Sequence, residues 1–540
     1  MLSIATRQEH DFLGIRDIPQ IVYWGVHTAR ALENFPISGT PISAMPELVR
    51  ALAHIKKAAA ATNAELGILA PATAQAIVAA CNDLLDGQHH DQFVVDVIQG
   101  GAGTSTNMNA NEVIANLALE HLGHDKGDYA VVHPNDHVNA SQSTNDVYPS
   151  ALRLALWEKS GQLQPQLTAL RQSLEAKAEQ FAGILKIGRT QLQDAVPMTL
   201  GQEFAAFASM LAADERRLAQ AREELTEVNL GGTAIGTGIN APAGYAEQVC
   251  RRLAEDSLVP VRPATDLIAA SQDTGAFVQL SGVLKLIAIR LSKICNDLRL
   301  LSSGPQAGYG DIRLPPRQAG SSIMPGKVNP VIPEVVNQVA FEIIGNDAAI
   351  TLAAEAGQLQ LNAFEPLIGW SLYKNLDHLD GALRTFKVHC VDGIEPRQDV
   401  LARQVRESVT LATALNPLIG YEKAAAIVKR AIATGQPLDR TAQELGILSA
   451  EEMDALLVPE KLTRPYSVTR TALTARPMTR ENPVSRTRHR VQRLVSTAFS
   501  TTGHEPCCTL RTPFGLFAQG YPYGPVSYTH LRAHETKANL

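Results

Sequence analysis

The segment 273–302 constrains the fold more than any other part of the chain, because its apolar residues recur at alternating spacings of four and three. They are Leu280, Leu284, Ile287, Leu291, Ile294, Leu298 and Leu301. This heptad pattern is typical of a long helix packed in a bundle. Lys285, Arg290, Lys293 and Asp297 interrupt the segment, so it lacks the long uncharged run that a membrane span needs.

Similar periodicity predicts three further long helices. One follows the sequence 320–330, with Ile332, Val336, Val339, Ile343 and Ile350 on one face. Another begins at Phe204 and continues to about residue 227, and a third covers 152–181, disturbed at Gly161 and Pro165. Strand-like alternation is scarce. We therefore predict an all-α fold with a central long-helix bundle.

Shorter helices are expected on both sides of the bundle. Ranges 46–67, 71–87 and 111–123 each end at a glycine suited to a left-handed cap, and so does 421–434, before Gly435. Ser449 and Glu452 form a capping box for a further helix. The predicted domains are residues 1–140 (helical), 141–395 (central bundle) and 396–469 (small and helical).

Residues 470–540 differ from the rest of the chain. They contain ten lysines and arginines against three acids and no sustained apolar period. Two interpretations stay open, a disordered basic extension or a sequence artefact from a frame error or assembly join, and we favour the artefact. The preceding residues carry a net charge of −13 against −6 for the whole chain, which makes nucleic acid an unfavourable partner.

Composition and cysteine usage are those of a soluble globular protein, with 45% hydrophobic and 19% charged residues. Residues 1–11 lack the apolar stretch of a secretory signal, so we expect a cytoplasmic location and no membrane partner. Cys81, Cys250, Cys295 and Cys390 form no CxxC pair, which argues against a zinc site and predicts buried thiols. Cys507 and Cys508 are adjacent.

The sequence 320–330, GSSIMPGKVNP, carries the strongest chemical signal. Ser321 and Ser322 follow a glycine, and Lys327 and Asn329 lie shortly after them. Such a loop can present backbone N–H groups and a cation to a carboxylate, and it can hold a serine that loses its proton readily. Taken alone, the pattern also fits a polar surface loop.

Four other polar clusters interrupt apolar sequence: 100–107, 133–146, 188–194 and 229–238. Turns and helix caps are the alternatives for the first three. We expect the third at the start of a long helix, where bound carboxylates are favoured. The fourth is rejected as a dinucleotide loop, because it follows helical sequence and lacks βαβ context. Together with the loop 320–330, the clusters predict recognition of a small substrate with two carboxylates. We predict no metal site.

At this point a family resemblance is visible. GSSIMPGKVNP resembles the defining motif of the fumarase/aspartase superfamily, and GGAGTSTNMN, NDHVNASQSTND and GRTQLQDAVPMTLGQE resemble its other shared blocks in the usual order. The similarity covers about residues 8–468. Within the superfamily, the sequences at 23–28, 318–319, 331–338 and 355–362 are most similar to aspartate ammonia-lyases.

The resemblance implies three helical domains, a homotetramer, and active sites built by three different subunits. The implied reaction is the reversible elimination of ammonia from L-aspartate to give fumarate. No organic cofactor is implied, and a divalent cation such as Mg²⁺ is a candidate activator. The alternatives are fumarate hydratase and, outside enzymes, a structural protein that reuses the fold.

Roles for individual residues follow from the resemblance. Ser321 is the expected base for the C3 proton of aspartate. The other expected substrate-binding residues are Thr104, Ser143, Thr144 and Ser322 for the β-carboxylate, Thr190, Lys327 and Asn329 for the α-carboxylate, and Asn145 with Gln191 for the amine. Many superfamily members have histidine where this chain has Gln191, paired with a glutamate that matches Glu334. A titrating histidine–glutamate pair is therefore absent at this position.

Overall fold

The computed structural model describes residues 5–465, which belong to one compact unit. The predictions for residues 470–540, including Cys507 and Cys508, lie outside the described residues. Two hydrophobic cores are present: a large one with buried residues from Ala31 to Leu401, and a small one from Leu411 to Met453. The domain bounds at residues 140, 395 and 469 stay predictions.

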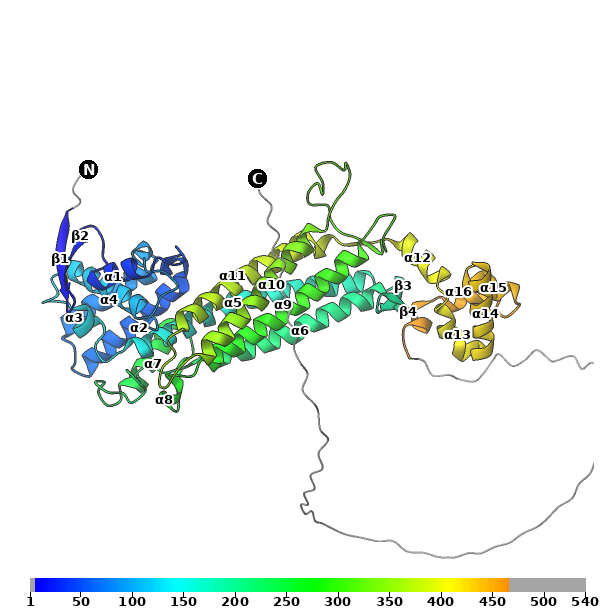
Figure 1. The fold of residues 1–540 in the computed structure, drawn as a ribbon. Coiled ribbons are helices and arrows are strands. Elements are labelled where there is room, and N and C mark those ends of the chain that lie inside the picture. Colours follow the sequence, from blue (N-terminus) through cyan, green and yellow to red (C-terminus); the bar gives the residue numbers. More distant parts are fainter. Residues whose placement is uncertain (1–4, 466–540) are drawn as a thin grey trace, which may run out of the picture. The chain divides into compact units, whose positions relative to one another are not determined.

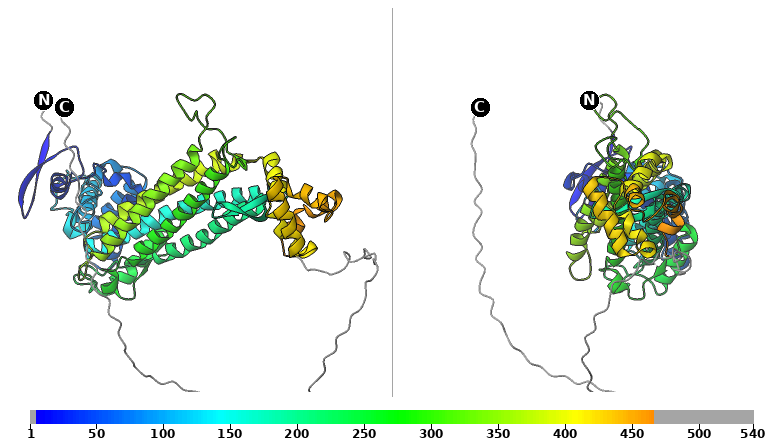
Figure 2. Two further views of the ribbon diagram at one scale, coloured as in Figure 1. Left: turned by 45° about the vertical axis from the view of Figure 1, so that its right-hand side comes forward. Right: turned by 90° about the vertical axis from the view of Figure 1, so that its right-hand side faces the viewer.

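Long helices form the predicted bundle, and they run alongside one another in both Figure 1 and the turned views of Figure 2. They are α5 (Thr144–Gln180), α6 (Leu200–Glu224), α9 (Gly275–Leu301), α10 (Val331–Glu355) and α11 (Glu365–His389). Helix α9 packs against α6 and α10, and α5 packs against α6 and α11. All seven residues of the heptad pattern in α9 are buried, so the predicted seam is confirmed.

Helix α9 is also, within residues 5–465, the helix long and apolar enough by length and composition to cross a membrane. Two of its charged residues form ion pairs with neighbouring helices of the bundle instead. Lys285 donates to Asp347 of α10 at 2.6 Å, and Arg290 pairs with Asp214 of α6. The prediction that α9 is a bundle helix is therefore confirmed.

The predicted disturbance of the helix at Gly161 and Pro165 is wrong. Helix α5 starts at Thr144 rather than residue 152 and continues through both positions. Gly161 leaves room for the neighbouring α6, since a Cβ there would stand 2.7 Å from Nη2 of Arg222. Pro165 itself is exposed, so its ring displaces no packed side chain.

The remaining helices flank the bundle. Before and beside it lie α1 (Val26–Asn34), α2 (Pro46–Glu65), α3 (Pro71–Leu85), α4 (Thr104–His121), α7 (Tyr245–Ser257) and α8 (Leu267–Ala270). After it come α12 (Gln398–Glu407), α13 (Leu411–Ile419), α14 (Tyr421–Thr434), α15 (Leu438–Glu444), α16 (Ala450–Leu456) and α17 (Pro459–Leu462). Gly435 has the predicted left-handed conformation, and the Ser449–Glu452 capping box is present. Helix α4 begins at Thr104, seven residues earlier than predicted.

Short strands were missed by the sequence analysis. They pair as β1 (Thr6–Asp11) with β2 (Gly14–Pro19), β3 (Leu185–Thr190) with β4 (Gln193–Thr199), β5 (Glu227–Val228) with β6 (Arg262–Pro263), and β7 (Ile312–Arg313) with β8 (Glu395–Pro396). Each sheet has only two strands, so few residues alternate and the signal is weak. The four cysteines at 81, 250, 295 and 390 are free and buried, as predicted.

Candidate active site

The start of α4 is shaped by a turn with left-handed backbone at three consecutive residues, Gly101, Ala102 and Gly103. A Cβ on Gly103 would collide with the ring of Tyr148 in α5, so glycine is required by close packing. The turn leads directly into Thr104, whose Oγ1 donates to the carbonyl of Gly101 at 2.7 Å. The first polar cluster is therefore part of a helix start that touches α5.

The start of α5 lies beside the start of α4. Ser143 caps α5, with its Oγ accepting from the N–H of Asn145 at 3.2 Å. Thr144 Oγ1 accepts a hydrogen bond from Nδ2 of Asn107 in α4 at 3.0 Å. The N-terminal ends of helices favour bound anions, and here two of them adjoin. One chain thus brings Thr104, Ser143, Thr144 and Asn145 together.

Asp146 explains the fourth polar cluster. Its buried carboxylate accepts N–H groups from Ser143 at 2.9 Å and from Gly231 and Thr233 at 3.0 Å. Burial raises the pKa of Asp146 to about 6, although these donors oppose the shift. The glycine-rich segment follows the two-residue strand β5, so the expectation that it follows helical sequence is wrong. The N–H groups of Gly231 and Thr233 are nevertheless occupied by Asp146, and those of the glycines at 232, 236 and 238 by backbone carbonyls, so the glycine N–H groups are not free to cradle a phosphate.

Thr190 and Gln191 lie at the tip of the β3–β4 hairpin, not at the predicted helix start. Thr190 pairs with Gln193 across the turn, and α6 begins only after Thr199. Gln191 has φ 52° and Leu192 has φ 63°, a left-handed conformation that strains residues with a Cβ. Backbone strain of this kind is common at functional sites.

A buried ion pair holds this hairpin next to its tip. Arg189 donates to both carboxylate oxygens of Asp311, at 2.6 and 3.2 Å, and Asp311 is fully buried. Burial alone would raise the pKa of Asp311, but Arg189 and the nearby Lys186 hold it below its usual range. Sequence analysis missed Arg189, although it stands in the GRT block, and Asp311 carries no sequence signal. The pair ties the hairpin to the chain that leads into the loop 320–330.

The loop 320–330 is held by its own backbone. Ser321 Oγ accepts N–H groups from Ile323 at 3.1 Å and from Met324 at 3.0 Å, an arrangement that stabilises negative charge on the oxygen. Asn329 Nδ2 donates to the carbonyl of Gly320 at 2.9 Å and closes the loop. Gly320 is required, because a Cβ would stand 2.8 Å from the carbonyl oxygen of Lys327. The side chains of Ser322 and Lys327 are exposed.

The predicted site residues fall into two sets at opposite ends of the bundle. Helix α5 has 37 residues, and at 1.5 Å per residue it separates Thr144 from β3 by about 55 Å. The loop 320–330 lies between α9 and α10, at the end of the bundle where β3 and β4 are drawn in Figure 1. Within residues 5–465 of one chain, neither Thr190 nor Ser321 reaches Thr144.

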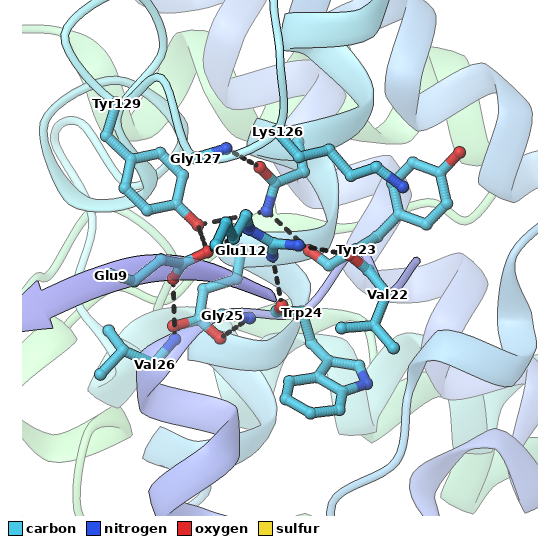
Figure 3. Close-up of polar contacts among 12 residues, drawn as sticks. Glu9, Val22, Tyr23, Trp24, Gly25, Val26, Glu112, Lys126, Gly127 and Tyr129 are labelled. Atoms are coloured by element: carbon cyan, nitrogen blue, oxygen red, sulfur yellow. Dashed lines mark hydrogen bonds and ion pairs between the residues drawn. The ribbon is translucent and has the colours of Figure 1, made fainter. Parts of the chain in front are cut away.

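Two buried carboxylates that sequence analysis missed hold the segment 22–28: Glu112 attaches it to α4 and Glu9 attaches it to β1 (Figure 3). Glu112 of α4 accepts N–H groups from Gly25, His27 and Thr28 at 2.7–3.1 Å. Glu9 accepts from Val26 N–H at 2.9 Å. Burial raises the pKa of Glu112 to about 7. These contacts fix α4, the helix that carries Thr104.

No group of three or more His, Cys, Asp or Glu side chains that could hold a metal ion is present in residues 5–465.

Comparison with known proteins gives consistent matches. The sequence profile of a family described as "Lyase" matches residues 16–345, and that of "Fumarase C C-terminus" matches residues 411–464. Aspartate ammonia-lyase of Pseudomonas aeruginosa is 55% identical over 462 residues, which cover 85% of this chain and 98% of the relative.

Solved structures give matches that agree with these sequence similarities. A cobalt-bound protein from Brucella melitensis, titled fumarate lyase:delta crystallin, matches with a TM-score of 0.82 and 56% identity over 84% of this chain and 98% of its own. A class II fumarase from Schistosoma mansoni matches with a TM-score of 0.81 and 36% identity over 86% of this chain and 100% of its own. The chain belongs to the lyase family that contains the aspartate ammonia-lyases and the class II fumarases.

Proposed function

We propose that this protein is an aspartate ammonia-lyase, which eliminates ammonia reversibly from L-aspartate to give fumarate. The observation that carries the proposal is the pair of adjoining helix starts that present Thr104, Ser143 and Thr144 as an anion site. Similarity supports the choice within the family, since identity is 55% to an aspartate ammonia-lyase and 36% to a class II fumarase.

The chemical difficulty is the weak acidity of the C3 proton of aspartate. Ser321 removes this proton, and the two N–H groups directed at its Oγ favour the alkoxide that it must form. Negative charge then accumulates on the β-carboxylate as an aci-carboxylate. The hydroxyls of Thr104, Ser143, Thr144 and Ser322, aided by the two helix dipoles, stabilise that charge.

The α-carboxylate and the amine are held by the second set of residues. Thr190, Lys327 and Asn329 bind the α-carboxylate, and Asn145 with Gln191 orients the amine. Asn329 and Asn145 each commit one N–H to a backbone carbonyl, of Gly320 and Ala234 respectively, which fixes their side chains. Gln191 cannot titrate, so no proton donor to the leaving ammonia is assigned.

A homotetramer completes this site. The two sets of residues are about 55 Å apart along α5, so a pocket that contains both must take them from different copies. The outward face of α10 supports such assembly, because Val335, Phe341, Ile344 and Leu352 are exposed there, Leu352 to 68%. A contiguous apolar face on a soluble helix is typical of a protein interface. A cytoplasmic location belongs to the same proposal, as does activation by a divalent cation such as Mg²⁺ without an organic cofactor.

The ultraviolet absorbance of fumarate separates the candidate functions. The full chain should produce fumarate from L-aspartate and none from L-malate. Fumarate from malate alone would make the protein a fumarate hydratase, and fumarate from neither substrate would favour a structural protein. A divalent-cation titration of the same assay tests the activation.

A further inference from the structure

Lys56 of α2 is a fully buried lysine whose Nζ lies against residues just before the start of α5. Its side chain has no exposed surface, and its Nζ donates to Asn139 Oδ1 and to Gln142 Oε1, both at 2.9 Å. In its ammonium form, Lys56 can only donate hydrogen bonds, so each group that faces Nζ then has to present an acceptor.

This requirement fixes the orientation of Asn139. Its Oδ1 must point to Lys56, and its Nδ2 then donates to the backbone carbonyl of Gln142 at 3.2 Å. The two ends of a side-chain amide are distinguished only by such partners, and here both partners agree.

The orientation of Asn139 in turn fixes Asn107 of α4. Asn107 Nδ2 stands 3.1 Å from Asn139 Oδ1 and 3.0 Å from Thr144 Oγ1, so the two hydrogens of one NH₂ group serve both oxygens. The reverse orientation would set two amide oxygens against each other. The observed orientation of the Asn107 amide avoids this repulsion. It does so although the buried Oδ1 of Asn107 has no hydrogen-bond partner within residues 5–465.

The consequence falls on Thr144. Its oxygen accepts from Asn107, so its own proton cannot point there, and the hydroxyl forms no other hydrogen bond within residues 5–465. We propose that Lys56, Asn139 and Asn107 form a relay of hydrogen bonds that commits the Thr144 hydroxyl to donate its proton to the substrate carboxylate. This role rests on the proposed ammonia-lyase function. Asn107, Asn139 and Lys56 are positioning residues, because they act through Thr144.

A double-mutant cycle between Asn107 and Thr144 tests the relay. We expect Asn107→Ala to lower kcat/KM for L-aspartate about 10- to 100-fold in the wild-type background, the effect of a hydrogen bond to a charged group. In the Thr144→Val background, the same substitution should change kcat/KM less than about threefold. The loss should fall mainly on kcat, because the charge on the carboxylate grows in the transition state.

Asn111 provides a matched control. It lies one turn further along α4, is fully buried, and donates from Nδ2 to the same Asn139 Oδ1 at 3.2 Å, but it does not contact Thr144. Asn111→Ala should lower the midpoint of thermal unfolding as much as Asn107→Ala does. The kcat/KM of Asn111→Ala should stay within about threefold of wild type. The substitution removes one donor to Asn139 Oδ1 but leaves the hydrogen bond between Asn107 and Thr144 in place.

If Asn107→Ala does not fold, Asn107→Asp replaces it. The carboxylate keeps the shape but only accepts, so it should capture the Thr144 proton and lower kcat/KM by at least as much, again only when Thr144 is present. Equal losses in both Thr144 backgrounds, or an equal loss from Asn111→Ala, would overturn the relay alone. A wild-type protein that makes no fumarate from aspartate would overturn the proposed function and the relay together.

Discussion

The start of α5 and the loop 320–330 hold two halves of one predicted site, yet they are constructed differently. Thr144 is oriented by side chains, through Asn107 and amides that end at the buried Lys56. Ser321 is oriented by backbone N–H groups alone, in a loop whose neighbouring side chains are exposed. The half proposed to bind the β-carboxylate is thus organised within one chain, whereas the half that carries Ser321 would gain its surroundings from other copies in the proposed homotetramer.

The largest effect should come from the exposed half. Ser321→Ala should lower kcat about 1,000-fold, the range that a positioned base contributes. The midpoint of thermal unfolding should shift by less than about 2 °C, because no buried packing is lost. Steady-state kinetics and calorimetry on the same preparation measure both. A kcat within about tenfold of wild type would mean that another group is the base.

Mixing variants from the two halves tests whether copies share sites. Ser321→Ala and Thr144→Val should each be impaired alone. When they are unfolded together, mixed equally and refolded, about one site in four should receive both intact residues and recover activity, given random assembly from symmetric copies. Mixing without unfolding serves as the control. Activity that never exceeds that of the separate variants would place both residues of a site in one chain.

A smaller effect is expected from Lys56, the buried lysine beside the start of α5. Burial lowers the pKa of Lys56 from 10.5 to about 7. The folded state therefore releases a proton that the unfolded state keeps, and stability should rise between about pH 7 and pH 10 by up to about 1.4 kcal/mol per pH unit. The difference between wild type and Lys56→Met isolates this slope in urea unfolding at pH 7, 8 and 9.

The groups that face Lys56 do not obscure that slope. The pKa of Asp146 is about 6, and burial raises the pKa of the Cys81 thiol above its ordinary range. Both groups are present in wild type and in Lys56→Met, so the titration of Asp146 near pH 6 and of the Cys81 thiol in the unfolded chain largely cancels in the difference. Parallel stability curves for wild type and Lys56→Met would show that Lys56 keeps an ordinary pKa.

The smallest effect concerns the strained hairpin tip. Leu192 has φ 63° and is 61% exposed, so Leu192→Gly should relieve strain and stabilise the protein by about 1 kcal/mol. Thermal unfolding measures the gain. Val196→Gly, at an exposed strand position of the same hairpin, should destabilise instead, because glycine is unfavourable in strands. A loss of stability from Leu192→Gly would mean that its side chain packs usefully.

Local signals in the sequence predicted local structure well. The seam of α9, the cap at Gly435 and the capping box at Ser449 depend on residues within a few positions of each other, and all are confirmed. The hairpin tip at Gln191 was misplaced, because its conformation depends on strand pairing that a few residues cannot signal.

The site was harder to predict than the fold. Asn107 and Asn139 stand inside polar clusters that the sequence analysis identified, but their role depends on contacts with each other. Lys56 sits among alanines, and only tertiary packing buries it. The distance between site residues was also hard to predict. Thr144 and Thr190 are 46 positions apart in sequence, and they lie far apart in space because most of that interval is the single helix α5.

Helix α5 therefore sets the distance between the two sets of predicted site residues within each chain. In the proposed homotetramer, every copy would carry Thr144 and Ser321 at a spacing that α5 dictates, so an insertion of one turn would change that spacing in every subunit at once. Natural variation in length is therefore expected only in the surface turns of this protein. Dilution that separates the subunits should abolish catalytic activity before any helix unfolds.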